Sequence, residues 1–290
     1  MPTDALTAPT PLTDHDAAVL RAWTPAFLET PDHQLARFQF ARGLDGEEHT
    51  AIVGPPGVGK SYTVEYLTRE IDESEAAQAR ESDGAHVPRR VFTFTTSTAA
   101  GRKTLLLDLY EAISGETLSA GNRRGWTPRH LIECIVTEAV AERYHLLVVD
   151  EAQMADETNL DQLRQVGDVA AARRHALGIV AVGTEELREK LVRIGQLGQR
   201  FSCEIRMPRI TREEIGPHVI GFHPHLPALA EQLGAARWDA LLAELFAKVN
   251  GSFRRLAVVL KNANAITRSR GEWMSEDVLR VAVEKLAPEV

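Results

Sequence analysis

The sequence predicts an α/β fold in which helices cover both faces of a parallel sheet, followed by a small helical lid domain. Two observations predict it. Short apolar runs, rich in β-branched residues, alternate with helical segments from residue 31 to about residue 210. Beyond "PRI" at 208–210 no convincing strand remains. We therefore expect a mobile arm and lead-in over 1–30, an α/β domain over 31–210 and the lid domain over 211–290.

The expected elements follow one another in a regular order. A helix over 31–43 precedes the buried strand in "HTAIVG", which stops at Gly54. A helix over 61–71, a strand over 90–98 and a helix over 105–113 come next. Thr127 and Pro128 are an N-cap and a first-turn proline, and they open a helix that reaches about Glu142. The remaining elements are strands at 145–150, 177–183 and 203–207, and lid helices at 238–249, 253–268 and 275–286.

Composition indicates a globular cytoplasmic protein without a membrane segment. Hydrophobic residues make up 44% of the chain, yet no apolar run approaches the roughly 20 residues that span a bilayer. The N-terminus lacks the features of a secretory signal, and the two cysteines, Cys134 and Cys203, suit a reducing compartment. The net charge is −8, but residues 1–83 hold 6 basic and 15 acidic side chains, so a polyanion can still meet a locally basic surface.

The segment "GPPGVGKS" has the spacing G-x-x-x-x-G-K-S and lies between an expected strand and an expected helix. Glycines let backbone N–H groups curl around phosphates at the helix N-terminus. Lys60 is expected to reach the β- and γ-phosphates of ATP, and Ser61 to ligate Mg²⁺. The expected nucleotide-binding residues are Gly54, Pro55, Pro56, Gly57, Val58, Gly59, Lys60, Ser61 and Tyr62.

The segment "LLVVDEAQ" is a buried strand that ends in two carboxylates. Asp150 is expected to hold Mg²⁺, and Glu151 to deprotonate the attacking water, which predicts an ATP hydrolase. Alternatively, Glu151 is only an acid in the first turn of a helix. Thr184, at the end of the next strand, can contact the water or the γ-phosphate, cap the following helix, or do both.

Taken together, these motifs resemble those of AAA+ ATPases over about residues 31–268. The order of "GPPGVGKS", "VVDE", "VAVGT", "GQRF" and "GSFRR" matches the successive motifs of that family. The resemblance implies that Thr184 is the first sensor and that Arg200 is an arginine finger completing a neighbouring subunit's site. It also implies that Arg254, or alternatively Arg255, is the second sensor. A finger in trans requires self-association into a hexameric ring or a helical filament.

Within AAA+ proteins the chain is most similar to the target-selection ATPases of transposition, of the TnsC, TniB and MuB type. The supporting features are "DEAQ", "VGTEEL", the length and a minimal lid. This resemblance implies double-stranded DNA and a transposase as partners, with backbone contacts from Arg102, Lys103, Asn122, Arg123 and Arg124. The alternative is an ATPase that acts only on protein partners, as in ExeA-like secretion proteins or regulatory switches.

Overall fold

A computed structural model of the chain describes residue 13 and residues 30–46, 48–83, 85–96, 104–118, 125–195 and 200–287. The described residues form two compact units: Thr30–Pro55 with Gly59–Met207, and 208–287 with Pro56–Val58. The first unit holds helices α2 (Pro31–Leu44), α3 (Lys60–Glu81), α4 (Thr104–Ser114), α6 (Pro128–Ala141), α7 (Glu157–Ala172) and α8 (Glu185–Arg193). Its strands are β1 (Thr50–Val53), β2 (Arg90–Thr95), β3 (Tyr144–Asp150), β4 (Gly178–Gly183) and β5 (Cys203–Arg206).

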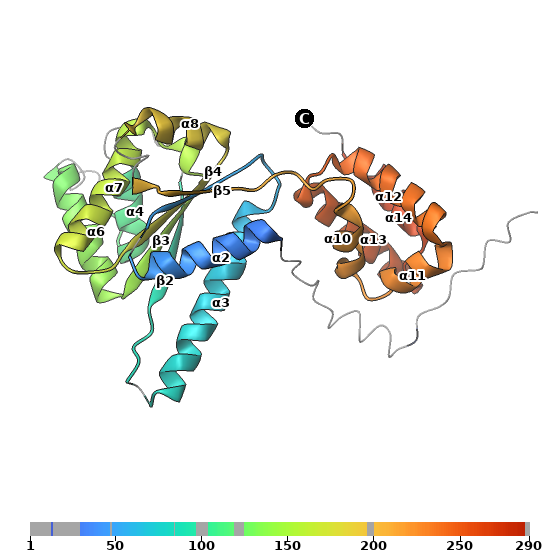
Figure 1. The fold of residues 1–290 in the computed structure, drawn as a ribbon, viewed down its shortest axis with the longest axis horizontal. Coiled ribbons are helices and arrows are strands. Elements are labelled where there is room, and N and C mark those ends of the chain that lie inside the picture. Colours follow the sequence, from blue (N-terminus) through green and yellow to red (C-terminus); the bar gives the residue numbers. More distant parts are fainter. Residues whose placement is uncertain are drawn as a thin grey trace, which may run out of the picture. The chain divides into compact units, whose positions relative to one another are not determined.

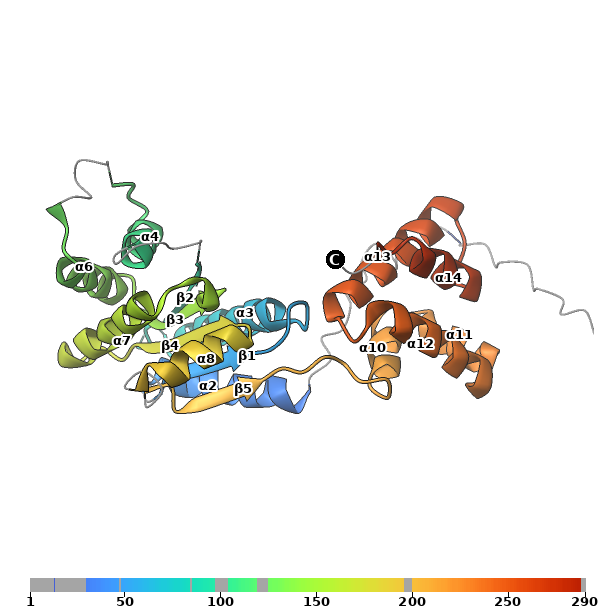
Figure 2. The ribbon, with the colours of Figure 1, turned by 90° about the horizontal axis from the view of Figure 1, so that it is seen from above.

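The strands of the first unit form one parallel sheet in the order β2-β3-β4-β1-β5 (Figure 1). Helices α2 and α3 pack on one face of the sheet, and α4, α6, α7 and α8 form the other layer (Figure 2). A parallel pair of strands needs a crossover connection, which explains why helices separate the strands in the sequence. The predicted α/β class with a helix-covered parallel sheet is confirmed.

Alternating side chains on β3 build both layers. Leu147 and Val149 belong to the core beneath α4, α6 and α7. Leu146 faces α2, where a Cβ added to Gly43 would lie 2.6 Å from its Cδ1 atom. The end of α2 also approaches β4 closely, since a Cβ on Gly178 would lie 2.3 Å from the carbonyl oxygen of Gly43. Glycine at 178 is therefore what lets the helix rest on the strand.

The second unit is helical throughout its described secondary structure, as the sequence predicts. Its core is apolar, with side chains such as Leu245, Leu256 and Val278 fully or almost fully buried. Among the described residues of the whole chain, no helix is both long enough and apolar enough to cross a membrane. The helices are α10 (Ile215–Phe222), α11 (Leu226–Leu233), α12 (Ala235–Val249), α13 (Phe253–Arg270) and α14 (Glu276–Glu284).

Helix α3 runs ten residues beyond the expected end at Ile71, to Glu81. The extension contains no Gly or Pro but little apolar periodicity, so sequence patterning underestimates it. Helices α7, α10 and α11 have no counterpart among the elements expected from the sequence. For α7 the missed signal is Asp156, whose side chain accepts a hydrogen bond from the backbone N–H of Asn159 and caps the helix.

A buried carboxylate fastens the extended part of α3 to the start of β2. The side chain of Glu75 is 4% exposed and accepts hydrogen bonds from Nε and Nη2 of Arg89, at 3.0 and 2.7 Å. The ring of His86 contacts the other carboxylate oxygen, and Arg89 continues to Asp45 beyond α2. Burial raises the pKa of Glu75, but the hydrogen bonds from Arg89 and His86 outweigh it and hold the pKa below its ordinary value.

We predict that Glu75→Gln lowers the free energy of unfolding by about 2 kcal/mol at neutral pH, because the change removes the charge of a buried carboxylate that is hydrogen-bonded to Arg89 and His86. Urea unfolding followed by circular dichroism measures it. The folded-state pKa of Glu75 is depressed, so its stabilisation is complete above the ordinary value of 4.5 and is lost as the pH falls through the folded pKa. The difference in the free energy of unfolding between the wild type and the Glu75→Gln protein therefore becomes smaller in acid.

Glu73→Gln is the matched control, because Glu73 is exposed on the same helix. It should change the free energy of unfolding by no more than about 0.5 kcal/mol. A Glu75→Gln protein as stable as the wild type at pH 7, or a gap that stays constant into acid, contradicts the account of Glu75.

Candidate nucleotide-binding site

The loop after β1 has the backbone that phosphate binding requires. Gly57 and Gly59 have φ of 79° and 103°, values that glycine adopts without strain. Gly59 is the N-cap of α3, and no side chain caps the helix there, which leaves N–H groups at its first turn available to an anion. The start of the loop is fixed to the sheet by the N–H of Gly54, which donates to the carbonyl oxygen of Gly183 at 3.2 Å.

Lys60 is the first residue of α3, and its side chain folds back over the loop. Its Nζ donates to the carbonyl oxygens of Gly54 and Pro55 at 2.8 and 2.9 Å. A cation held above an uncapped helix N-terminus makes a cradle for a negatively charged phosphate group. The next residues are Ser61 and Tyr62, and the side chain of Tyr62 is half exposed. The residues present therefore fit a nucleoside triphosphate.

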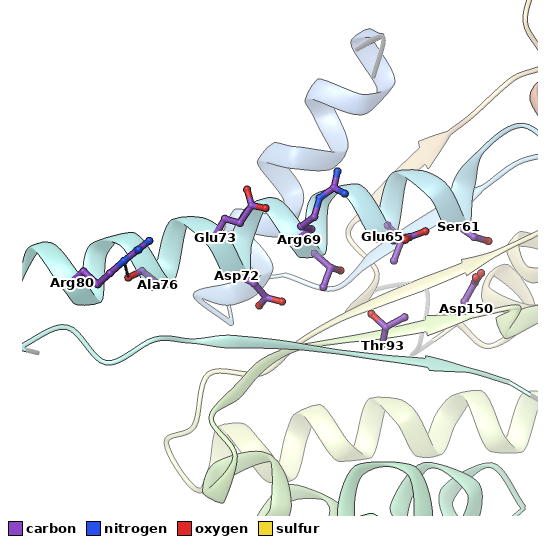
Figure 3. Close-up of a pocket in the computed structure, with 11 residues that line it drawn as sticks. Ser61, Glu65, Arg69, Asp72, Glu73, Ala76, Arg80, Thr93 and Asp150 are labelled. Atoms are coloured by element: carbon purple, nitrogen blue, oxygen red, sulfur yellow. Dashed lines mark hydrogen bonds between the residues drawn. The ribbon is translucent and has the colours of Figure 1, made fainter. Parts of the chain in front are cut away.

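Ser61 and Asp150 line the same groove, which has a volume of about 610 Å³ and runs along α3 above β2 and β3. Figure 3 shows the two side chains at one end of this groove, with Ser61 on α3 and Asp150 at the end of β3. A hydroxyl and a carboxylate facing one space are a donor set that Mg²⁺ accepts. The two residues that the sequence assigns to Mg²⁺ are thus neighbours in the fold, although 89 positions separate them.

Glu151 follows Asp150 and leaves the strand sharply, with a φ of 54° that is unusual for a residue other than glycine. A short 3-10 turn, η1 (Ala152–Met154), comes next. Glu151 is therefore not an acid in the first turn of an α-helix, which was the alternative. The carboxylate accepts a hydrogen bond from Nε2 of Gln153 at 2.5 Å. The Oε1 atom of Gln153 accepts the backbone N–H of Thr184 at 3.2 Å.

Thr184 is the N-cap residue of α8, but its side chain makes no capping hydrogen bond. Of the two roles that the sequence leaves open, the N-cap position is confirmed, although the side chain adds no hydrogen bond to it. Its position at the carboxyl end of β4, beside the ends of β1 and β3, is compatible with the sensor role, which stays a prediction.

Arg200 lies at the opposite edge of the sheet from the phosphate loop. β1 and β5 are parallel, with Thr50 opposite Cys203, so Arg200 stands beyond the start of the strands while Gly54 follows their end. A four-residue strand alone separates these edges by about 13 Å. Arg200 forms an ion pair with Asp168 at 2.9 Å and remains 59% exposed. His49, Asp168 and Arg200 line one small cavity. Burial and the charge of Arg200 lower the pKa of His49.

The second unit presents Arg254 and Arg255 at the start of α13 in different ways. The backbone N–H of Arg254 donates to the carbonyl oxygen of Gly57, a loop residue that belongs to this unit, at 2.9 Å. The guanidinium of Arg255 instead donates to the carbonyl oxygen of Lys248 from Nε and Nη2. The choice of Arg254 rather than Arg255 as the second sensor stays a prediction.

The residues expected to contact DNA lie outside the described part of the chain: Arg102, Lys103, Asn122, Arg123 and Arg124. Sequence reasoning missed two residues that organise the site, Gln153 and Lys190. The Nζ of Lys190 donates to the carbonyl oxygens of Gln153 and Ala155 and so holds η1 against α8. The "Q" of "DEAQ" was available as a signal, but nothing in the sequence points Lys190 toward η1.

Residues 42–191 match the AAA domain family. Similar structures include ORC2 of Aeropyrum pernix, solved as ADPNP-ADP complexes, with a TM-score of 0.63, 19% identity and coverage of 91% of this chain and 69% of the other. Cdc6p of Pyrobaculum aerophilum has a TM-score of 0.63 and 16% identity, and the match covers 97% and 73% of the two chains.

A third similar structure is ORC1 of Aeropyrum pernix in complex with DNA, with a TM-score of 0.61, 16% identity and coverage of 92% and 66%. No curated protein matches the sequence. The structural matches are too distant in sequence to show more than a common fold. The family match, in contrast, covers just over half of the chain and includes the phosphate loop, β3 with its two carboxylates, and β4. The chain therefore belongs to the AAA domain family.

Proposed function

We propose that the protein is an AAA+ ATPase that hydrolyses ATP in head-to-tail oligomers on double-stranded DNA and directs a transposase to its target. The observation that carries the ATPase part is the meeting of Ser61 and Asp150 at one end of a groove, with Glu151 as the next residue. Phosphoryl transfer needs little more than positioned charge and a base for the attacking water, and these residues supply both.

The residues divide the chemistry among them. Lys60 and the N-terminus of α3 bind the phosphates, and Ser61 and Asp150 would hold Mg²⁺, which neutralises charge on the phosphate oxygens. Glu151 accepts the proton of the water whose oxygen bonds to the γ-phosphorus, while the bond from that phosphorus to the bridging oxygen of ADP breaks. To Thr184 we assign contact with the same water or with the γ-phosphate. Charge that develops on the transferred group calls for a further cation.

Arg200 is the cation that we assign to that task in a neighbouring subunit. It stands at the far edge of the sheet from its own phosphate loop, so it cannot serve its own site without refolding β5. A contact between one edge of the sheet and the opposite edge of the next copy is head-to-tail, and such contacts generate rings or helical filaments. Arg254, from the second unit, is the candidate sensor of the bound nucleotide.

The DNA and transposition parts rest on sequence. Arg102 and Lys103 directly precede α4, and Arg123 and Arg124 come shortly before α6. The motifs "DEAQ" and "VGTEEL" resemble those of target-selection ATPases. A structurally similar protein, Aeropyrum pernix ORC1, has been seen in complex with DNA. Contacts to phosphates alone would bind DNA with little sequence preference and with strong salt dependence.

We predict that Glu151→Gln lowers the rate of ATP hydrolysis about a hundredfold or more while ATP binding persists, because an amide cannot accept the proton of water. Phosphate release gives the rate, and a fluorescent ATP analogue gives the affinity. Glu157→Gln, at an exposed position on α7, is the control and should hydrolyse ATP normally. Normal hydrolysis by the Glu151 variant would remove the residue from the role of base.

We predict that Arg200→Ala and Lys60→Ala proteins, each inactive alone, regain hydrolysis when mixed. The Arg200 variant keeps an intact phosphate loop, and the Lys60 variant keeps an intact arginine, so mixed oligomers contain complete sites. About a quarter of wild-type activity is the ceiling for random equal mixing of two kinds of subunit in head-to-tail contacts. A mixture no more active than its components would contradict action in trans.

We predict that the double variant Arg102→Ala, Lys103→Ala no longer retains duplex DNA at moderate salt but still binds nucleotide. The reason is that the two cations which would neutralise DNA phosphates are gone. Filter binding over a salt series measures it. The adjacent exposed pair Arg173 and Arg174 is the matched control, and its double alanine variant should retain DNA. Unchanged DNA retention by the first variant defeats the assignment. ATP hydrolysis that is indifferent to duplex DNA would favour protein-only partners.

A further inference from the structure

The side-chain amide of Gln153 joins the two catalytic candidates that the sequence treats separately. Its Nε2 donates to Oε2 of Glu151 at 2.5 Å, and its Oε1 accepts the backbone N–H of Thr184 at 3.2 Å. We propose that Gln153 is a positioning residue that fixes the carboxylate of Glu151 relative to the first residue after β4. This inference rests on the proposed function, because it concerns the base of that reaction.

The orientation of the amide follows from its partners. A backbone N–H can only donate, so the atom of Gln153 that faces Thr184 must be the oxygen. The NH₂ group is therefore the end that faces Glu151, and it donates to the carboxylate. One oxygen of Glu151 is occupied by the amide. The other oxygen, Oε1, remains the acceptor for the proton of water.

Glu151 needs such a support. It is exposed, and its backbone stands in the left-handed region, so neither burial nor a helix restricts its side chain. Gln153, in contrast, is only 7% exposed. An exposed base held by a buried amide is an arrangement in which the second residue sets the position of the first.

The surroundings of Gln153 are shaped to keep it in place. Gly183 leaves room for the amide, because a Cβ there would lie 2.6 Å from Oε1 of Gln153. Lys190 donates to the backbone carbonyl oxygens of Gln153 and Ala155, and its side chain is 15% exposed. The backbone of the turn that carries Gln153 is thus attached to α8, and the side chain of Gln153 is attached to Thr184, the residue after β4.

Two substitutions separate the two ends of the amide. Gln153→Glu keeps an oxygen for the N–H of Thr184 but replaces the donor to Glu151 with a second carboxylate. Gln153→Met removes both contacts at similar volume. We expect kcat of the Glu variant to fall about tenfold to a hundredfold, the loss that accompanies one hydrogen bond to a charged group. Its affinity for a fluorescent ADP analogue in the absence of Mg²⁺ should stay within about twofold.

Hydrogen exchange of the nucleotide-free protein supplies a second readout. The amide of Thr184 should exchange at the wild-type rate in Gln153→Glu and faster in Gln153→Met, since only the second change removes its acceptor. Gln165→Met, a change of the same kind at a half-buried position on α7, is the control and should leave kcat and the exchange of Thr184 unaltered.

Two results overturn the proposal. One is a Gln153→Glu protein with wild-type kcat. The other is a Gln153→Glu protein whose loss of kcat comes with faster exchange at Thr184 or weaker nucleotide binding, which would indicate a general structural role. The Glu151→Gln protein distinguishes this failure from that of the proposed function. If that protein is inactive while Gln153→Glu is normal, Glu151 remains the base and only the role of Gln153 is lost.

Discussion

The parallel pairing of β1, β3 and β4 is the constraint on which the site depends. The carboxyl ends of parallel strands lie at one edge of the sheet, so the phosphate loop after β1, the carboxylates after β3 and Thr184 after β4 are brought together there. The hydrogen bond from Gly54 to Gly183 closes this edge. Residues that are far apart in the sequence thereby lie at one edge of the sheet.

The sequence predicts this edge well because strand ends are marked locally. Buried apolar runs that stop at Gly54, at Asp150 and at Gly183 can be recognised in the sequence without knowing the fold. Contacts that join distant segments are not predictable in that way. Glu75 meets Arg89 only because α3 continues past Ile71, and its polar extension carries no apolar stripe that would reveal its length. The partners of Gln153 and Lys190 depend on how α8 packs against η1.

The same pairing separates Arg200 from the site of its own chain, because the start of β5 and the end of β1 are at opposite edges. Under the proposed function Arg200 therefore acts on the nucleotide of a neighbouring subunit. Within one chain Arg200 is held by Asp168, which also pairs with Arg164. Exposed ion pairs contribute about 0 to 1 kcal/mol, so exchanging Asp168 for a phosphate in a drier contact costs little.

Helix α8 connects the edge of the sheet that holds Thr184 with the chain segment that leads to Arg200. The N–H of its N-cap residue, Thr184, donates to Gln153, whose amide donates to Glu151, and Lys190 attaches the middle of the helix to η1. Its last residue, Arg193, precedes Arg200 by seven positions. A helix is stiff along its axis, and a packed interior does not deform gradually. A displacement of α8 would therefore move the amide of Gln153, and with it the carboxylate of Glu151 that the amide contacts.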